Sequence, residues 1–228
     1  MGSEQIIEMY DAAADDYTEA FFNRETLQAE LHYVESFLSH ISGGGRILDV
    51  GCGPGIEAEL IRRKRFHYEG IDASEKMIAI ARMRNPMLSF HVMDMRTLLF
   101  PNDHFDGVMA LESMIHFQKS EVAGVLRELY RVLKKNGALL LALQKGAGQK
   151  LYRFPFDQSK RVLVNLYQPG EMQHLLEHIG FQVLKTMCRK PLVMEFKNDK
   201  LIVIARRLSW EHRPGARIGK NLSDCDGG

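Results

Sequence analysis

One short stretch constrains the fold of this chain more than any other. It is ILDVGCGPG, residues 47–55, in which an apolar run breaks into three closely spaced glycines. Such a run is typical of a buried strand, and the glycines permit a tight turn whose bare backbone can approach a ligand. A helical pattern follows directly. A strand, a glycine turn and a helix in this order predict backbone N–H groups that face a small ligand.

The rest of the chain alternates short apolar segments with helical patterns. Continuous apolar strands alternating with helices predict an α/β fold with a doubly wound, mainly parallel sheet covered on both faces. We expect strands over residues 46–51, 67–73, 88–95, 105–111, 138–143, 181–187 and 200–207. We expect helices over residues 56–64, 74–84, 120–137 and 171–180. Ser74 is placed to cap the second of these helices, and Asn136 with Gly137 to close the third.

Three segments lie outside this alternation. Residues 1–41 have apolar side chains at helical spacing, so we expect two amphipathic helices there. Residues 144–170 form an insertion rich in aromatic and basic side chains. Residues 209–228 have too little apolar content to pack, which predicts a disordered tail. We expect residues 1–208 to form a single domain.

The composition limits the class of protein and its expected location. Apolar residues make up 45% and charged residues 26%, which is typical of a soluble globular protein. There is no apolar run long enough to cross a bilayer and no signal peptide at the start, so we expect a cytoplasmic protein without a membrane partner. The three cysteines share no C-x-x-C spacing, which gives no case for a metal site.

The glycine turn by itself fits more than one ligand. Asp72 ends the second expected strand, where an acid can accept hydrogen bonds from a ribose, as in a nicotinamide dinucleotide site. The dinucleotide fingerprint, however, is G-x-G-x-x-G, whereas this turn reads G-x-G-x-G. Asp49 stands two residues before the first glycine, where it would repel a pyrophosphate and face a cofactor amine or water.

Several segments, in order, resemble motifs of the class I S-adenosylmethionine-dependent methyltransferases of the small-molecule type. ILDVGCGPG resembles the first motif, YEGIDASEKMIAIAR the second and VMDM the third. FDGVMALESMIHF and VLKKNGALLLAL resemble the fourth strand and the helix and strand after it, and QPGEMQHLLEHIGF the last helix. YDAAADDYTEAF is similar to the N-terminal helix that many such enzymes fold over the cofactor.

This resemblance implies a seven-stranded Rossmann-like sheet with an antiparallel last strand, N-terminal lid helices and S-adenosylmethionine as cofactor. It implies that the loop around Gly51 and Gly53 holds the methionine part, that Asp72 binds the ribose, and that Asp94 and Met95 contact the adenine. The full set of cofactor contacts expected from it is Tyr17, Asp49, Gly51, Cys52, Gly53, Gly55, Asp72, Ala73, Met77, Asp94, Met95 and Leu111.

The implied reaction is direct displacement of the methyl group onto a small-molecule acceptor through oxygen, nitrogen or carbon. A base is needed only for a hydroxyl or a protonated amine, and Glu112 and His116 are the candidates. An unperturbed histidine has a pKa of about 6.5, which suits that task, although His116 can equally be a packed side chain beside Phe117. Cys52 is interpreted as a small buried residue rather than a nucleophile.

The acceptor is expected to enter between the N-terminal helices and the insertion. Two interpretations of the insertion stay open: its basic and aromatic side chains receive an anionic or aromatic substrate, or they form a solvated loop with a few packed rings. The side chains concerned are Lys150, Tyr152, Arg153, Phe154, Phe156, Lys160 and Arg161.

Other functions compete with this one. Tyr130 and Lys134 form the Y-x-x-x-K of a short-chain dehydrogenase, but the helix is expected to end just after Lys134 and the glycine spacing differs. A regulatory protein that binds the cofactor without catalysis, and a protein methyltransferase, stay open. Nucleic-acid methylation is disfavoured, because the net charge is only +1 and the segment ALES stands where such enzymes carry their proline-rich motif.

Overall fold

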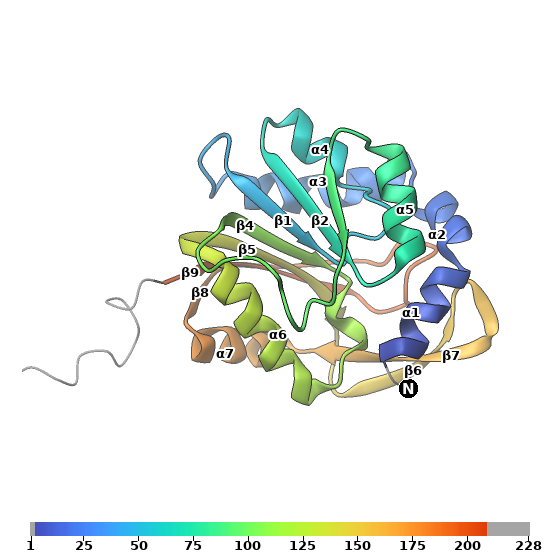
Figure 1. The fold of residues 1–228 in the computed structure, drawn as a ribbon. Helices are drawn as coiled ribbons and strands as arrows, with labels where there is room; N and C mark the ends of the chain where they lie inside the picture. The colour runs from blue at the N-terminus through green and yellow to red at the C-terminus, as the bar shows by residue number, and fades with distance from the viewer. Residues whose placement is uncertain (1–2, 209–228) are drawn as a thin grey trace, which may run out of the picture.

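The structure, a computed structural model, describes residues 3–208, so the expected tail at 209–228 lies outside the described residues. A central sheet is covered by helices on both faces, as the sequence predicts (Figure 1). The helices are α1 Ser3–Ala12, α2 Ala14–Phe21, α3 Arg24–Leu38, α4 Ala58–Arg63, α5 Glu75–Arg84, the short 3₁₀ helix η1 Met114–His116, α6 Lys119–Val132 and α7 Pro169–Ile179. The strands are β1 Arg46–Val50, β2 His67–Asp72, β3 Ser89–Val92, β4 Phe105–Leu111, β5 Leu133–Lys145, β6 Gln149–Phe154, β7 Asp157–Tyr167, β8 Phe181–Arg189 and β9 Lys200–Arg207.

The strand order follows the doubly wound pattern. Strands β3, β2, β1, β4 and β5 are parallel neighbours, so the chain reverses direction across the sheet between β1 and β4. Strand β9 is antiparallel to both β5 and β8. The expected mainly parallel sheet with an antiparallel last strand is therefore confirmed, and its switch point lies at the carboxyl ends of β1 and β4, where such sheets bind ligands.

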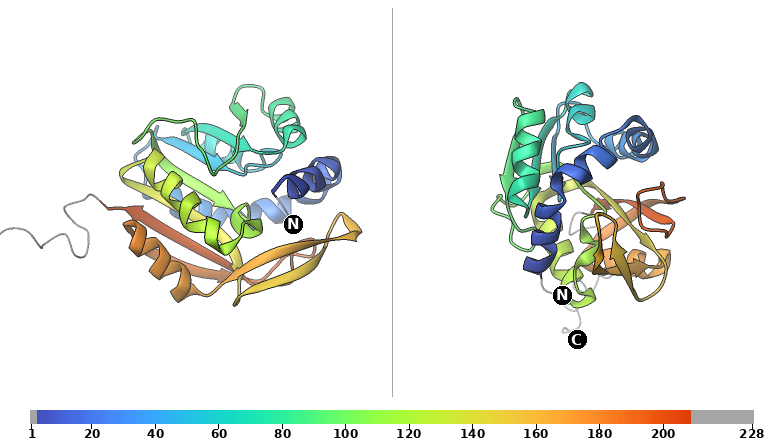
Figure 2. Two further views of the ribbon diagram at one scale, coloured as in Figure 1. Left: turned by 60° about the horizontal axis from the view of Figure 1, so that its bottom comes forward. Right: turned by 90° about the vertical axis from the view of Figure 1, so that its right-hand side faces the viewer.

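The described residues contain nine strands rather than the expected seven. The two additional strands, β6 and β7, form an antiparallel hairpin within the insertion at 144–170. Strand β7 joins the sheet only at its end, where Leu166 and Tyr167 pair with β5. The hairpin extends beyond the edge of the sheet and lies beside the N-terminal helices (Figure 2).

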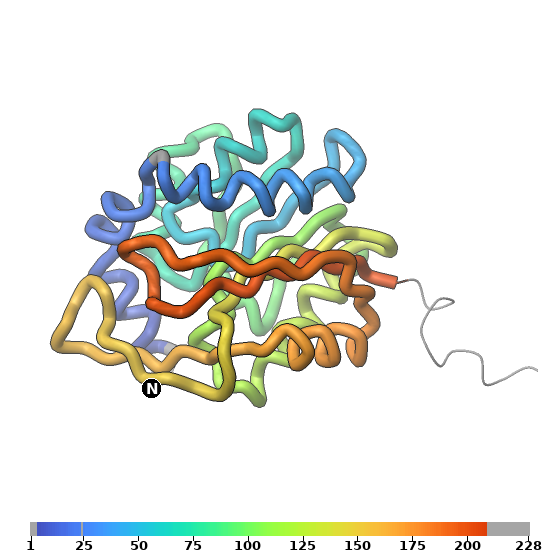
Figure 3. Tube along the Cα trace, turned by 180° about the vertical axis from the view of Figure 1, so that it is seen from behind, coloured from blue at the N-terminus to red at the C-terminus, as the bar shows by residue number. Residues whose placement is uncertain are grey.

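Side chains alternate between two apolar clusters on opposite faces of the sheet. Leu48 and Val50 of β1 pack with α6 and α7, whereas Ile47 packs with α3, α4 and α5. Viewed from behind, α3 runs alongside β8 and β9 (Figure 3). Alternation of this kind fixes the register of a buried strand, because a slip of one residue would exchange its two faces.

Two helix boundaries differ from the expected ones. The first 41 residues form three helices, because the backbone of Ala13 departs from helical geometry and Asn23 starts α3 by accepting a hydrogen bond from Thr26 N at 3.0 Å. Helix α6 ends at Val132, so the prediction that Asn136 and Gly137 close it is wrong. Leu133 already pairs with Phe105 of β4, and that tertiary pairing ends the helix.

The cap of α5 is as predicted, because the Ser74 side chain accepts a hydrogen bond from Met77 N at 3.0 Å. Within residues 3–208, none of the helices is long and apolar enough to cross a membrane.

Candidate cofactor and acceptor site

The turn after β1 has the conformation that its glycines allow. Gly51 and Gly53 have φ values of 74° and 51°, in the left-handed region that favours glycine. A Cβ on Gly51 would lie 2.2 Å from Cβ of Ser113, so the loop after β4 leaves room only for a hydrogen there. This close approach brings the carboxyl ends of β1 and β4 together.

Asp72 holds the turn in place from the end of β2. Its carboxylate accepts hydrogen bonds from Gly53 N and Ser74 N, each at 2.9 Å, and its burial raises the pKa. Asp49 is 1% exposed and accepts a hydrogen bond from the Tyr68 hydroxyl at 2.8 Å. Burial raises the pKa of Asp49 to about 7. Asp72 thus contacts the glycine turn directly, whereas Asp49 precedes it in β1 and is held by Tyr68.

Two adjoining pockets open at this edge of the sheet, and they contain all but one of the residues expected from the sequence. The first pocket is lined by the expected residues Tyr17, Gly51, Gly53, Asp72, Ala73, Met77, Asp94, Met95, Leu111, Glu112 and His116. The second pocket contains Asp49 and Cys52. Its wall is shared with the first pocket through Tyr10, Tyr17, Gly51, Gly53, Leu111 and Glu112. Gly55 lines neither pocket, because it packs against Asn85 and Phe90.

Aromatic rings from two distant segments meet over the second pocket. The ring of Tyr17 lies 4.6 Å from that of Phe21 and 5.5 Å from that of Phe156, measured between centroids. Tyr10 contacts Phe154 in the same way, at 5.3 Å. Helices α1 and α2 and the hairpin β6–β7 therefore cover this pocket together.

The basic side chains of the insertion point elsewhere. Lys150, Arg153, Lys160 and Arg161 are exposed and line neither pocket. The two interpretations of the insertion are each met in part: its four cations are exposed and contact neither pocket, whereas its rings Phe154 and Phe156 line the second pocket.

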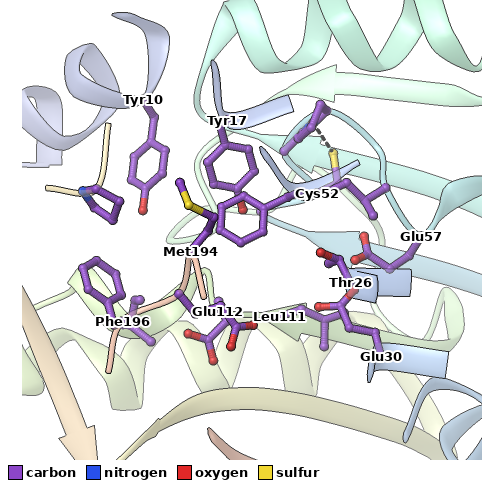
Figure 4. A pocket seen from close by; sticks show the side chains of 18 of the residues that line it. Tyr10, Tyr17, Thr26, Glu30, Cys52, Glu57, Leu111, Glu112, Met194 and Phe196 are labelled. Atoms are coloured by element: carbon purple, nitrogen blue, oxygen red, sulfur yellow. Dashed lines mark hydrogen bonds between the residues drawn. The ribbon is translucent and has the colours of Figure 1, made fainter. Parts of the chain in front are cut away.

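Glu112 lies on the wall that the pockets share and has an uncommon environment. Its φ of 55° is in the left-handed region, which few residues other than glycine adopt. Oε2 accepts hydrogen bonds from Gln144 and from Nζ of Lys200, the latter at 3.0 Å. Oε1 is buried without a hydrogen-bond partner among the described residues. Figure 4 shows Glu112 between Phe196 and Leu111.

His116 does not have the near-neutral pKa on which its candidacy as a base rested. Its Nδ1 lies 3.2 Å from the Leu163 carbonyl and its Nε2 lies 2.9 Å from the Tyr10 hydroxyl. Burial lowers the pKa of His116 to about 4. The side chain is a neutral link between α1, η1 and β7, which matches the packed alternative.

Asp94 lies in the first pocket but is already paired. Its carboxylate forms an ion pair with Arg96 at 2.6 Å, which lowers the pKa of Asp94 despite its partial burial. The pair is 40% exposed on each side.

Sequence patterns could not have identified several of the residues that line the pockets. Glu30 comes from α3, Glu195 from the loop before β9 and Lys200 from the start of β9, and all three line the second pocket with Glu57. Only Glu57, two residues after the glycine turn, stands beside a recognisable motif.

The dehydrogenase alternative has no support in the geometry. The Tyr130 hydroxyl donates to the Leu208 carbonyl, and Lys134 is paired with Asp106 at 2.8 Å. Neither residue lines a pocket. Across the described part of the chain no cluster of three or more potential ligand side chains could hold a metal ion.

A doubly wound sheet with this strand order, a left-handed glycine turn after β1 and an acid ending β2 is typical of folds that bind a nucleoside cofactor at the switch point. A family model described as a methyltransferase domain matches residues 47–137. This match, together with the relatives and solved structures below, supports a class I S-adenosylmethionine-dependent methyltransferase, a class whose cofactor is S-adenosylmethionine.

Curated methyltransferases match different lengths of this chain. The methyltransferase GfsG of Streptomyces halstedii is 36% identical over 109 residues, which is 45% of this chain and 38% of the relative. Phosphoethanolamine N-methyltransferase 1 of Arabidopsis thaliana is 26% identical over 84% of this chain and 38% of its own length. The chain thus spans about two fifths of the length of these relatives.

Solved structures share the fold at low sequence identity. The cyclase SpnF superposes with a TM-score of 0.72 at 20% identity, over 90% of this chain and 96% of SpnF. A magnesium protoporphyrin IX methyltransferase from Synechocystis PCC 6803, solved with bound S-adenosylmethionine, gives a TM-score of 0.67 at 16% identity, over 90% of this chain and 96% of that one.

Proposed function

We propose that this chain binds S-adenosylmethionine in the first pocket and transfers its methyl group to a small molecule in the second. The observation that carries the proposal is the shared wall of the two pockets, formed by the glycine turn, Leu111 and Glu112. A donor on one side of this wall and an acceptor on the other would be adjacent without a further conformational change. Holding reactants in this way supplies much of the rate of a displacement reaction.

The residues of the first pocket fit the proposed cofactor. Asp72 uses one lone pair of each oxygen to hold the turn and keeps others for ribose hydroxyls. Ala73, Met77 and Met95 supply an apolar slot for adenine, with Asp94 at its rim. Asp49 and Cys52 line the second pocket beside the turn and Tyr17, so they would contact the methionine end where it reaches past the shared wall. The bound cofactor supplies a methyl group already activated on a sulfonium.

Aromatic side chains of this chain cover the proposed acceptor site. Tyr10, Tyr17 and the rings of Phe154 and Phe156 line the second pocket and contact one another. Glu112 faces this pocket with a free carboxylate oxygen, so we assign to it, rather than to His116, the hydrogen bond to the acceptor.

The test must separate turnover from binding, because a fold does not establish a reaction and the similar fold of SpnF belongs to a cyclase. Calorimetry measures binding of S-adenosylmethionine by the wild type and by Asp72→Ala, with Glu75→Ala, an exposed acid of α5, as matched control. We expect binding to be lost only in Asp72→Ala.

Transfer is then measured with the methyl-labelled cofactor and fractionated metabolite pools. A labelled small molecule and release of S-adenosylhomocysteine support the proposal. Binding without a labelled product from any pool favours the regulatory alternative, and label on a protein favours protein methylation. Absence of cofactor binding contradicts the proposal as a whole.

A further inference from the structure

Carboxyl groups predominate around the second pocket. Five carboxyl groups line it, from Glu30, Asp49, Glu57, Glu112 and Glu195, together with one basic side chain, that of Lys200. Lys200 is already engaged, since its Nζ lies 3.0 Å from Glu112 and 3.8 Å from Glu195. Among the described residues, Glu30, Asp49 and Glu57 form no ion pair, so the pocket has uncompensated acids. Once these acids are ionised, an anionic group is repelled from such a pocket and a cationic group is attracted.

Two carboxylate oxygens of this pocket are buried and unsatisfied. They are Oε2 of Glu30, whose residue is only 8% exposed, and Oε1 of Glu112. The side chains of Glu30, Glu57 and Thr26 point toward one another at one end of the pocket (Figure 4). A buried polar atom without a partner costs about 1–3 kcal/mol, so a ligand that brings N–H donors to these oxygens would recover that energy.

Aromatic rings complete the surroundings of these acids. Tyr17, Phe21 and Phe156 form a three-ring cluster, with Phe21 and Phe156 at 6.1 Å between centroids, and all three line the same pocket. Ring faces attract a cation, most strongly when water is excluded. Carboxylates and ring faces together are the surroundings that favour an ammonium group over a neutral hydroxyl.

We propose that the methyl acceptor is an amine, which enters the second pocket as an ammonium ion and is held by Glu30, Glu57 and the three-ring cluster. This inference rests on the proposed function and specifies its substrate class. Glu112, on the wall shared with the first pocket, receives the proton that the reaction releases.

The proposed step balances in atoms and charge. The ammonium gives one proton to Oε1 of Glu112, which frees the nitrogen lone pair. That pair forms a bond to the methyl carbon while the carbon–sulfur bond breaks, and its electrons stay on sulfur. The product leaves as a methylated ammonium with its charge unchanged, and the proton on Glu112 returns to water.

The ionisation of the pocket acids agrees with a cationic ligand. Burial raises the pKa of Glu57 to about 7, and that of Glu30 well above its ordinary value, with Glu57 adding repulsion. Tyr33 of α3 and Arg189 of β8 also face Glu30, and Asp49 faces Glu57. An ammonium favours the ionised carboxylates, so its binding must release protons and weaken as the pH falls below about 7.

The test compares two probes of the same shape and different charge. Benzylamine and benzyl alcohol are titrated by calorimetry into the full chain saturated with S-adenosylhomocysteine, at pH 8. We expect benzylamine to bind at least ten-fold more tightly than benzyl alcohol. Glu30→Gln and Glu57→Gln should each weaken benzylamine at least five-fold without changing the affinity for S-adenosylmethionine. Glu35→Gln, an exposed acid on the same helix as Glu30, and Glu59→Gln, near Glu57, are the matched controls.

Equal affinities for the two probes would overturn the proposal. So would a loss of S-adenosylmethionine affinity in Glu30→Gln with benzylamine binding unchanged, because these acids would then hold the amino group of the cofactor. In the transfer assay, acceptor activity is expected in the metabolite fraction retained by a cation exchanger, and activity confined to neutral or anionic fractions contradicts an amine acceptor. Failure of the proposed function differs from all of these, since it leaves no cofactor binding or no product.

Discussion

The Tyr10 hydroxyl lies 2.9 Å from Nε2 of His116, and this contact joins helix α1 to the 3₁₀ helix η1 that follows β4. Because Nδ1 of His116 lies 3.2 Å from the Leu163 carbonyl, the proton sits on Nδ1 and Nε2 accepts from Tyr10. The neutral imidazole thus fastens the first helix over the pockets. A histidine arranged in this way holds helix α1 in place over the site and is too weak a base to take a proton from a substrate.

We therefore expect His116 to titrate near pH 4. Burial lowers its pKa because the charged imidazolium would lose its hydration, so the ring stays neutral at every physiological pH. The measurement is the NMR titration of the histidine ring signals, with His116→Gln identifying the resonance. A midpoint near 6.5 would show that the ring is hydrated and would restore His116 as a candidate base. The pH profile of methyl transfer should likewise lack a step assigned to this residue.

Replacing Glu57 by glutamine should stabilise the protein at high pH. Burial raises the pKa of Glu57 to about 7, so the folded state binds its proton more tightly than the unfolded state does. The stability of the wild type should therefore fall as the pH rises from about 4.5 to 7. Glu57→Gln removes this loss, and we expect a gain of up to about 3 kcal/mol at pH 8 and little at pH 5.

Urea unfolding at the two pH values measures that difference. Glu59→Gln serves as control, because Arg62 and Arg63 lower the pKa of Glu59 to about 2 and no gain at pH 8 is expected there. A Glu57→Gln variant that is destabilised at both pH values would mean that this carboxylate is structural. Higher stability together with weaker benzylamine binding would instead indicate that Glu57 contributes to ligand binding at a cost in stability.

Lys200 should be needed to hold Glu112. Its side chain is 1% exposed, and its removal leaves a buried carboxylate without its cation. We expect Lys200→Met to destabilise the fold by about 3–5 kcal/mol. The double variant Lys200→Met, Glu112→Gln should recover part of that loss, because no uncompensated charge remains at Glu112. A double-mutant cycle by urea unfolding tests this, and strictly additive effects of the two changes would contradict the pairing.

The glycine turn should not tolerate a side chain at Gly51. An alanine there would have an unfavourable φ of 74°, and its Cβ would come within 2.2 Å of Ser113 Cβ. We expect Gly51→Ala to lower the melting temperature and to abolish cofactor binding in calorimetry. Gly124→Ala is the matched control, since this glycine of α6 has open space around its Cβ position. There we expect a gain of about 0.5–1 kcal/mol and unchanged binding. Unaltered binding in Gly51→Ala would mean that the turn can rearrange.

Local sequence patterns predicted the regular parts of this fold well. Apolar runs and helical spacing identified the expected strands and the helices between them, because burial on both faces of a parallel sheet requires them. The N-cap at Ser74 was also predictable, since it depends on neighbours three residues away. The patterns predicted the wrong end for α6, because a tertiary contact determines the backbone conformation there. Leu133 pairs with Phe105, and this pairing ends the helix.

The sequence by itself determined the order of the elements, the glycine turn and the place of Asp72 at the end of β2, because these depend on residues close along the chain. Only the tertiary structure decided the chemistry of the second pocket. It places Lys200 against Glu112, 88 residues away, brings Glu30 of α3 to Glu57, and buries His116 so that its pKa falls. Charge pairing and desolvation depend on which distant side chains exclude water around a group, and no local pattern records that.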